Sequence, residues 1–128
     1  MERPSGIIAK IRAALGPHLV KGKYRKHIPR NAPKSWGCCY IANEALFFLW
    51  GKANGYTPMR VPCKLGRKET GTHWFLEHRA SGLQVDITAD QFKPNRIPDY
   101  EAATPCGFLT KQPSQRAQAI IDSVLATQ

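Results

Sequence analysis

Three side chains in this sequence carry the groups that build a thiol nucleophile: the thiol of Cys39, the imidazole of His73 and the carboxylate of Asp86. An imidazole next to a cysteine takes the thiol proton and then holds a positive charge beside the thiolate. A carboxylate on the far side of the ring fixes its tautomer and stabilises that charge. The three residues therefore indicate cysteine-dependent chemistry on a carbonyl group, provided that the fold brings them together.

Cys39 begins an apolar run that continues to Trp50 and is interrupted only by Asn43 and Glu44. The apolar residues occur all round a helical cylinder, which predicts a helix surrounded by protein, and Gly51 follows as a stop signal. A thiol in the first turn of such a helix meets unpaired N–H groups and the positive end of the dipole, which favour the thiolate. This placement suits a nucleophile.

The segment 72–88 alternates as the two strands of a β-hairpin. With a loop of two or four residues, His73 lies opposite Thr88 and Phe75 lies opposite Asp86, so His73 and Asp86 are diagonal neighbours on one face. The other face is then apolar and holds Trp74, Leu76, Leu83, Val85 and Ile87, whereas an odd loop mixes the two faces. The alternation therefore favours the register that lets His73 meet Asp86.

The remaining patterns predict an α+β fold in a single domain, residues 1–128. Its parts are an N-terminal helix with a basic arm (1–35), a catalytic core (36–92) and a loop with a C-terminal helix (93–128). The expected elements are a helix over Ser5–Leu15, a strand over Thr57–Leu65, a long loop over Asp90–Pro105, a short edge strand over Gly107–Thr110 and a helix from Pro113 to Leu125.

The chain is strongly basic, with 19 Lys and Arg against 9 Asp and Glu in 128 residues. A net charge of +10 favours acidic partners or nucleic acid. Candidate contacts lie in the irregular arm before the central helix, which also fits a solvated loop: Lys21, Lys23, Arg25, Lys26 and Arg30. We expect a cytoplasmic protein with reduced cysteines and no membrane contact, because no secretory leader, membrane-length segment or disulfide framework is evident.

The motifs Gly37-Cys38-Cys39-Tyr40, His73-Trp74 and Asp86-Ile87-Thr88 resemble the transglutaminase-like branch of the papain-like cysteine enzymes, over about residues 36–92. Small bacterial and phage proteins carry similar stretches. The resemblance implies that the helix bearing the cysteine is buried against a small antiparallel sheet that supplies His and then Asp. In this chain Trp74 follows His73 directly, the Asp-x-Thr triplet lacks its usual middle proline, and Pro33 stands where papain has its oxyanion-hole glutamine.

This interpretation assigns Cys39 as the nucleophile, His73 as its base and Asp86 as the residue that orients the base. The Cys39 N–H is one oxyanion donor, and the Trp36 indole or the Asn31 amide is a candidate for the second. The predicted function is that of a hydrolase or acyltransferase: a protease, deamidase or transglutaminase-like enzyme acting on an amide or thioester of a protein or peptide-like substrate. Neither cofactor nor metal is expected.

Each of these residues also has a simpler interpretation. Cys39 fits inert packing in the core, Cys38 is the alternative nucleophile, and Asp86 fits a residue that orders the turn toward Asp90. A zinc site at the adjacent cysteines and His73 lacks a Cys-x-x-Cys pair, and His18, His27 and His78 belong to no constellation. The alternative function is a non-catalytic basic protein that binds nucleic acid or an acidic host protein.

Overall fold

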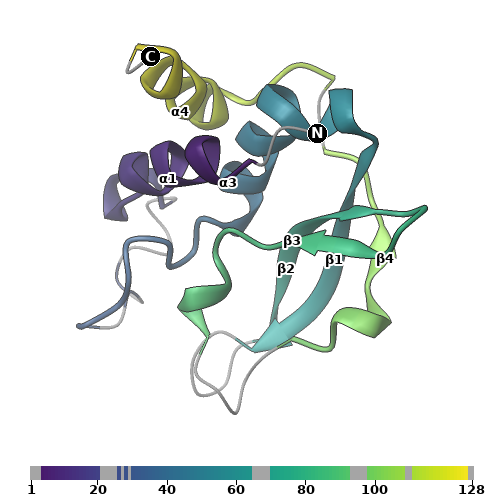
Figure 1. Cartoon of the computed structure of the whole chain (residues 1–128). Helices are drawn as coiled ribbons and strands as arrows, with labels where there is room; N and C mark the ends of the chain where they lie inside the picture. Colours follow the sequence, from purple (N-terminus) through teal and green to yellow (C-terminus); the bar gives the residue numbers. More distant parts are fainter. Residues whose placement is uncertain are drawn as a thin grey trace.

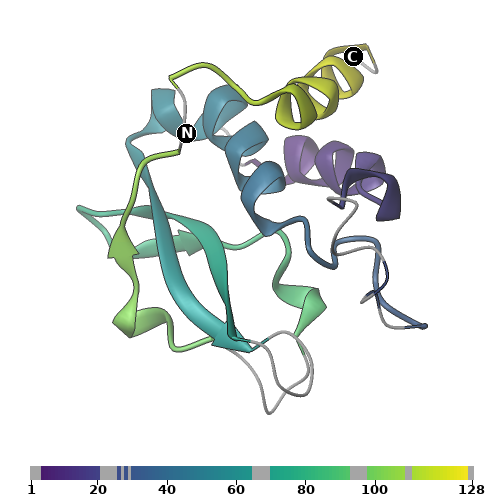
Figure 2. The same cartoon turned by 180° about the vertical axis from the view of Figure 1, so that it is seen from behind.

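The computed structural model describes residues 4–20, 26, 28, 30–64, 70–92, 98–108 and 111–126, with backbone alone at 63, 64, 70 and 71. These residues form an α+β domain with three α-helices and one antiparallel sheet, in the strand order β3-β2-β1-β4. The helices gather on one side of the molecule and the sheet on the other (Figure 1, Figure 2). No helix in the described ranges has the length and apolar character needed to cross a membrane.

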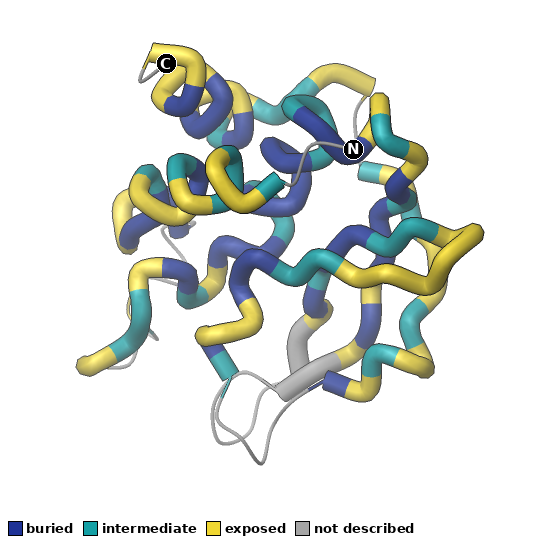
Figure 3. Tube along the Cα trace, in the orientation of Figure 1, coloured by how far each residue is buried: buried dark blue, intermediate teal, exposed yellow. Residues whose placement is uncertain are grey.

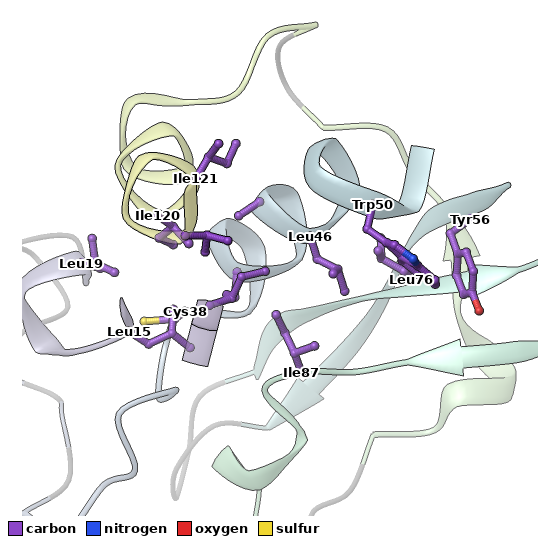
Figure 4. Packing of buried hydrophobic residues seen from close by; sticks show 14 of the residues in the cluster. Leu15, Leu19, Cys38, Leu46, Trp50, Tyr56, Leu76, Ile87, Ile120 and Ile121 are labelled. Atoms are coloured by element: carbon purple, nitrogen blue, oxygen red, sulfur yellow. The ribbon is translucent and has the colours of Figure 1, made fainter. Parts of the chain in front are cut away.

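Helix α3 (Cys39–Leu46) is the central helix that the apolar run predicts. It packs against α1 (Ser5–Ala14), α4 (Gln115–Ala126) and the sheet, and its residues from Ala42 to Leu46 are buried. Its apolar side chains meet those of α4 on one side and Leu76 of the sheet on the other (Figure 4). Helix α3 therefore lies between the other two α-helices and the sheet, as expected for a helix that is apolar all round.

The helical path continues beyond α3 through a π turn, η2 (Phe47–Gly51), and a 3₁₀ turn, η3 (Lys52–Asn54). It ends at Gly55, whose φ of 79° lies in the left-handed region that favours glycine. The next residue, Tyr56, begins the sheet.

The sheet consists of β1 (Tyr56–Lys64), β2 (Thr70–His78), β3 (Leu83–Val85) and β4 (Thr104–Pro105). In the β2–β3 hairpin, Leu76 pairs with Val85 and His78 with Leu83, which confirms the predicted even register. The pairing stops at Val85, however, so the predicted pairs of His73 with Thr88 and Phe75 with Asp86 do not form. The chain turns after Val85 because the Asp86 carboxylate accepts the N–H of Thr88 at 3.3 Å.

Two further expectations about the sheet are wrong. The edge strand is Thr104–Pro105 and not Gly107–Thr110: Thr104 pairs with Arg60, and Phe108 packs its ring against Tyr40 instead; residues 109 and 110 lie outside the described part. Leu83, expected on the buried apolar face, is 62% exposed, because the hairpin tip extends beyond the helices. The tip is exposed in Figure 3 as well.

Both faces of the sheet are covered, although the sequence predicts a polar face around His73. Phe75 lies on the His73 side of β2 and forms a second buried cluster with Met59 and Val61 of β1. The segment around Tyr100 and Ala103 packs against this cluster. The centre of the sheet is therefore covered on both faces, and His73 is buried there.

Glu44, one of the two polar residues in α3, anchors the start of α4. Its carboxylate is fully buried and accepts the N–H of Ser114 at 2.7 Å and the Ser114 hydroxyl at 2.8 Å. The same hydroxyl accepts the N–H of Ala117 at 3.3 Å, as an N-cap does. This contact joins the C-terminal helix to the helix that carries Cys39.

We expect Glu44→Ala to lower the free energy of unfolding by about 2–3 kcal/mol, because the two donors of Ser114 lose a charged, fully buried acceptor. Urea unfolding followed by circular dichroism measures this. The matched control is Asp122→Ala, which removes an exposed carboxylate on α4 and should change the unfolding free energy by less than about 0.5 kcal/mol. Equal losses in the two variants would contradict the anchoring role.

Candidate active site

The fold brings Cys39, His73 and Asp86 into one contiguous group. His73 Nε2 lies 2.5 Å from Asp86 Oδ2, and the Cys39 thiol interacts with the same ring and raises its pKa. Because Nε2 faces Asp86, Nδ1 is the ring nitrogen that remains open to another partner. The arrangement is a thiol, an imidazole and a carboxylate in series.

The first turn of α3 reaches His73 because one edge of β2 is open there. Strand β3 pairs only with residues from Leu76 to His78, so the carbonyls of Thr72 and Trp74 have no partner strand on that side. Asn43 Nδ2 donates to the Trp74 carbonyl at 2.8 Å, and the Cys39 thiol lies 3.6 Å from the Thr72 carbonyl. The start of the helix thus takes the place of a strand, and this puts Cys39 beside His73.

Asn43 also ties the helix to itself, since its Nδ2 donates to the Cys39 carbonyl at 2.8 Å. It is fully buried, and both of its donor contacts are made to backbone. One side-chain amide therefore sets the position of the Cys39 backbone relative to β2.

Asp86 is held by donors from three segments of the chain. Besides the ring of His73, its Oδ2 accepts the hydroxyl of Tyr100 at 2.6 Å, and its Oδ1 accepts the N–H of Thr88. Tyr100 is not predicted from the sequence as a residue of the site, because no local pattern in the proline-rich stretch around it points there. The hydroxyl is brought there only by the path of the chain across the Phe75 side of the sheet.

Gln91 is a second residue that the sequence did not reveal. It lies in the 3₁₀ turn η4 (Ala89–Gln91), and its Oε1 accepts the N–H of Gly37 at 3.2 Å. This contact directs Nε2 toward the interior, where it donates to Thr88 Oγ1 at 3.1 Å and lies 3.4 Å from His73 Nδ1. Gln91 therefore joins the loop before Cys39 to the imidazole.

The site is almost closed to solvent and carries a charged imidazole. His73 is 0% exposed and Cys39 is 6% exposed. Burial lowers the pKa of His73, but the hydrogen bonds to Asp86 and Cys39 and the charges of these two groups together raise that pKa to about 9. At neutral pH the ring is therefore an imidazolium next to the thiol.

The other cysteines have different surroundings. Cys38 is fully buried, and its sulfur lies in the core near Leu15 (Figure 4), 3.5 Å from the Trp36 carbonyl. Burial raises the pKa of the Cys38 thiol, which disfavours Cys38 as the nucleophile. Cys38, Cys39 and Cys106 are free thiols, and the side chain of Cys63 lies outside the described residues.

The remaining candidates are only partly located. The Cys39 N–H lies in the first helical turn, where no intrahelical carbonyl accepts it. Trp36 is half-buried and Asn31 is exposed, and their roles as oxyanion donors stay predictions. Of the basic-arm residues, Lys26 and Arg30 are exposed, whereas Lys21, Lys23 and Arg25 lie outside the described part. Within the described ranges, no group of three or more His, Cys, Asp or Glu residues is placed to hold a metal ion.

Comparisons with protein-family models, with curated proteins and with solved structures gave no match to this chain. The chemistry of the site therefore rests on its geometry.

We expect Cys39 to be the most reactive thiol of the folded protein. At about pH 6, where ordinary thiols are almost fully protonated, iodoacetamide should label Cys39 well before the half-buried Cys106, because only Cys39 has an imidazolium beside it. Peptide mapping by mass spectrometry measures the two rates. His73→Ala should remove the difference, and equal labelling of Cys39 and Cys106 in the unaltered protein would refute the assignment.

We also expect the ring of His73 to titrate near pH 9 in an NMR experiment. Asp86→Asn should lower this pKa, because the neutral amide removes a charge that favours the imidazolium, whereas Asp99→Asn at an exposed position should leave it unchanged. Folding raises the His73 pKa from 6.5 to about 9, so its contribution to stability is complete below pH 6.5 and is lost as the pH rises through about 9. A native pKa at or below 6.5 would contradict the charged pair.

Proposed function

We propose that this protein is a cysteine-dependent acyl hydrolase or acyltransferase that acts on an amide or thioester bond. The single observation that carries the proposal is the buried imidazole of His73, which is bonded to a carboxylate through one nitrogen and interacts with the Cys39 thiol. A buried histidine needs a hydrogen-bond partner in any role, so the contact with Asp86 alone is not diagnostic. The thiol in the first turn of a helix beside the same ring is the feature that favours catalysis.

In the first step, the Cys39 thiolate attacks the substrate carbonyl carbon. A carbon–sulfur bond forms, the carbonyl electron pair moves to oxygen, and the Cys39 N–H at the start of α3 donates to that oxygen. The His73 imidazolium then gives its Nδ1 proton to the leaving amine or thiol as the bond to the carbonyl breaks. Asp86 holds Nε2–H throughout, so the ring keeps its orientation.

In the second step, His73 is neutral and Nδ1 takes a proton from water or from an acceptor amine. The oxygen or nitrogen attacks the thioester, and the acyl group leaves Cys39. Water gives hydrolysis and an amine gives transfer, so one set of residues supports both reactions.

The arrangement of the elements supports the same proposal. A helix with its thiol in the first turn packs against an antiparallel sheet that supplies His73, and Asp86 follows on the chain after β3. We infer a papain-like, transglutaminase-like architecture from this order and from the motif resemblance.

The test is to trap the acyl-enzyme. The protein is incubated with an aryl thioester, and intact-mass analysis should show one added acyl group. This adduct should be absent in Cys39→Ser and present in Cys106→Ser, and His73→Ala should slow its formation by about a hundredfold or more. Added methylamine should then release the acyl group as an amide if transfer competes with hydrolysis. Acylation of Cys106 instead of Cys39, or an unchanged rate in His73→Ala, would contradict the proposal.

A second candidate is a basic binding protein, and the distribution of charge favours it: residues 3–43 include nine Lys and Arg and no Asp or Glu. A protein that only binds should keep its affinity for an anionic partner in Cys39→Ala and should form no acyl adduct. The acyl-trapping experiment therefore separates the two candidates.

A further inference from the structure

The N-terminal basic region lies beside the candidate active site. Lys34 lies in the first of two consecutive turns, in which the Trp36 N–H donates to the Pro33 carbonyl and the Cys38 N–H to the Ser35 carbonyl, each at 3.0 Å. These turns lead directly into Cys39. The end of the basic arm and the nucleophile therefore belong to one compact segment.

The same segment is attached to η4. Ser35 Oγ donates to Asp90 Oδ1 at 2.6 Å, and Gly37 is bonded to Gln91, the residue that touches His73. Residues 30–38 and the 89–92 turn lie on the same side of the molecule in both views (Figure 1, Figure 2). The part of the segment that directly precedes Cys39 is thus attached to the turn that touches the imidazole.

The positive charges of this region are largely unbalanced. The charge of Arg12 is balanced, since its guanidinium contacts the Asp90 carboxylate at 2.9 Å. The hydrogen bond between them holds the pKa of Asp90 below its ordinary value. The other described ion pairs are His73 with Asp86 and Arg79 with Glu77, so no described carboxylate pairs with the remaining four cations of the region. These four, the basic face, are Lys10, Lys26, Arg30 and Lys34.

Two exposed acidic residues lie on another side of the molecule. Asp99 and Glu101 belong to or adjoin the 3₁₀ turn η6 (Tyr100–Ala102), which lies at the opposite side of the molecule from residues 30–38 in both views (Figure 1, Figure 2). The basic face therefore carries positive charge that no described carboxylate pairs. Such a charge concentrates anionic partners there and speeds their association.

We infer that the substrate of Cys39 is an acidic protein segment, which docks on the basic face with its scissile amide or thioester beside the thiol. This inference rests on the proposed function, because an acyl reaction at Cys39 requires a carbonyl that a protein chain supplies. An acidic peptide also matches the spread of the charges, since Lys26, Arg30 and Lys34 are exposed cations at successive positions along the chain.

The test uses two short peptides with the same chloroacetyl group, one rich in Asp and Glu and the other with Asn and Gln in their place. The group alkylates Cys39: a carbon–sulfur bond forms and chloride leaves. At about 0.02 M salt the acidic probe should label Cys39 roughly tenfold faster than the neutral probe. The difference should vanish near 0.5 M salt, where the Debye length is only about 4 Å.

A pair of matched charge reversals locates the effect. Lys26→Glu with Arg30→Glu should abolish or invert the preference for the acidic probe. Lys52→Glu with Lys111→Glu changes the net charge equally at exposed positions and should retain most of the preference, because Lys52 follows η2 at the far end of the helical path from Cys39. Neither pair includes a residue of the site.

Iodoacetamide labelling of Cys39 in the same variants reports the proposed function separately, because this small neutral reagent does not sense the basic face. Equal rates for the two probes at low salt, or equal losses in the two charge-reversal variants, would overturn the inference while leaving the reactive thiol in place. Protection of Cys39 by a single-stranded oligonucleotide, with no preference between the peptides, would overturn it in favour of nucleic acid.

Discussion

The site depends on one docking contact, in which the first turn of α3 fills the open edge of β2. Asn43 makes this contact with two hydrogen bonds of 2.8 Å, one to β2 and one to the backbone of Cys39. A strand in this position would satisfy the same carbonyls but would place no helix N-terminus beside His73. Because β3 stops at Val85, the edge is free for the helix, and the chain after β3 is free to turn and present Asp86.

A charged imidazole in a closed site is stable only when its surroundings compensate for lost hydration. Desolvation opposes the imidazolium of His73, and the contacts to Asp86 and Cys39 outweigh it. Asp86 in turn accepts hydrogen bonds from Tyr100 and Thr88, so its charge is also satisfied. The Phe75 cluster and the segment around Tyr100 exclude water from this side of the sheet, which strengthens the electrostatic contacts inside.

Two functional requirements meet in residues 30–39. The segment carries exposed cations at its start and the thiol at its end, and Gln91 bonds to its backbone between the two. A partner that binds the exposed cations of this stretch would, under the proposed function, contact the same short segment that holds the proposed nucleophile. The C-terminal helix is joined to the helix that begins at Cys39, because Ser114 donates two hydrogen bonds to Glu44 in the second half of α3.

The sequence by itself determined the main elements and the identity of the three central residues. Apolar residues all round the segment after Cys39 require a surrounded helix, and alternation in 72–88 requires an even hairpin register; both patterns are local consequences of backbone period. The polar interruptions Asn43 and Glu44 were visible too, but their partners were not, because Trp74 and Ser114 are far away in the chain. A buried polar group must find a partner, yet sequence does not say which one.

Only the tertiary structure decided how the three residues meet and what holds them. The sequence predicted that His73 and Asp86 meet across a continued hairpin, whereas the contact forms after the strand has ended and the chain has turned. Tyr100 and Gln91 come from irregular segments, where no period marks which side chains point inward. The edge strand was misplaced for the same reason: the pairing of Thr104 and Pro105 is set by the backbone of β1, and a two-residue strand is too short to leave a pattern of its own.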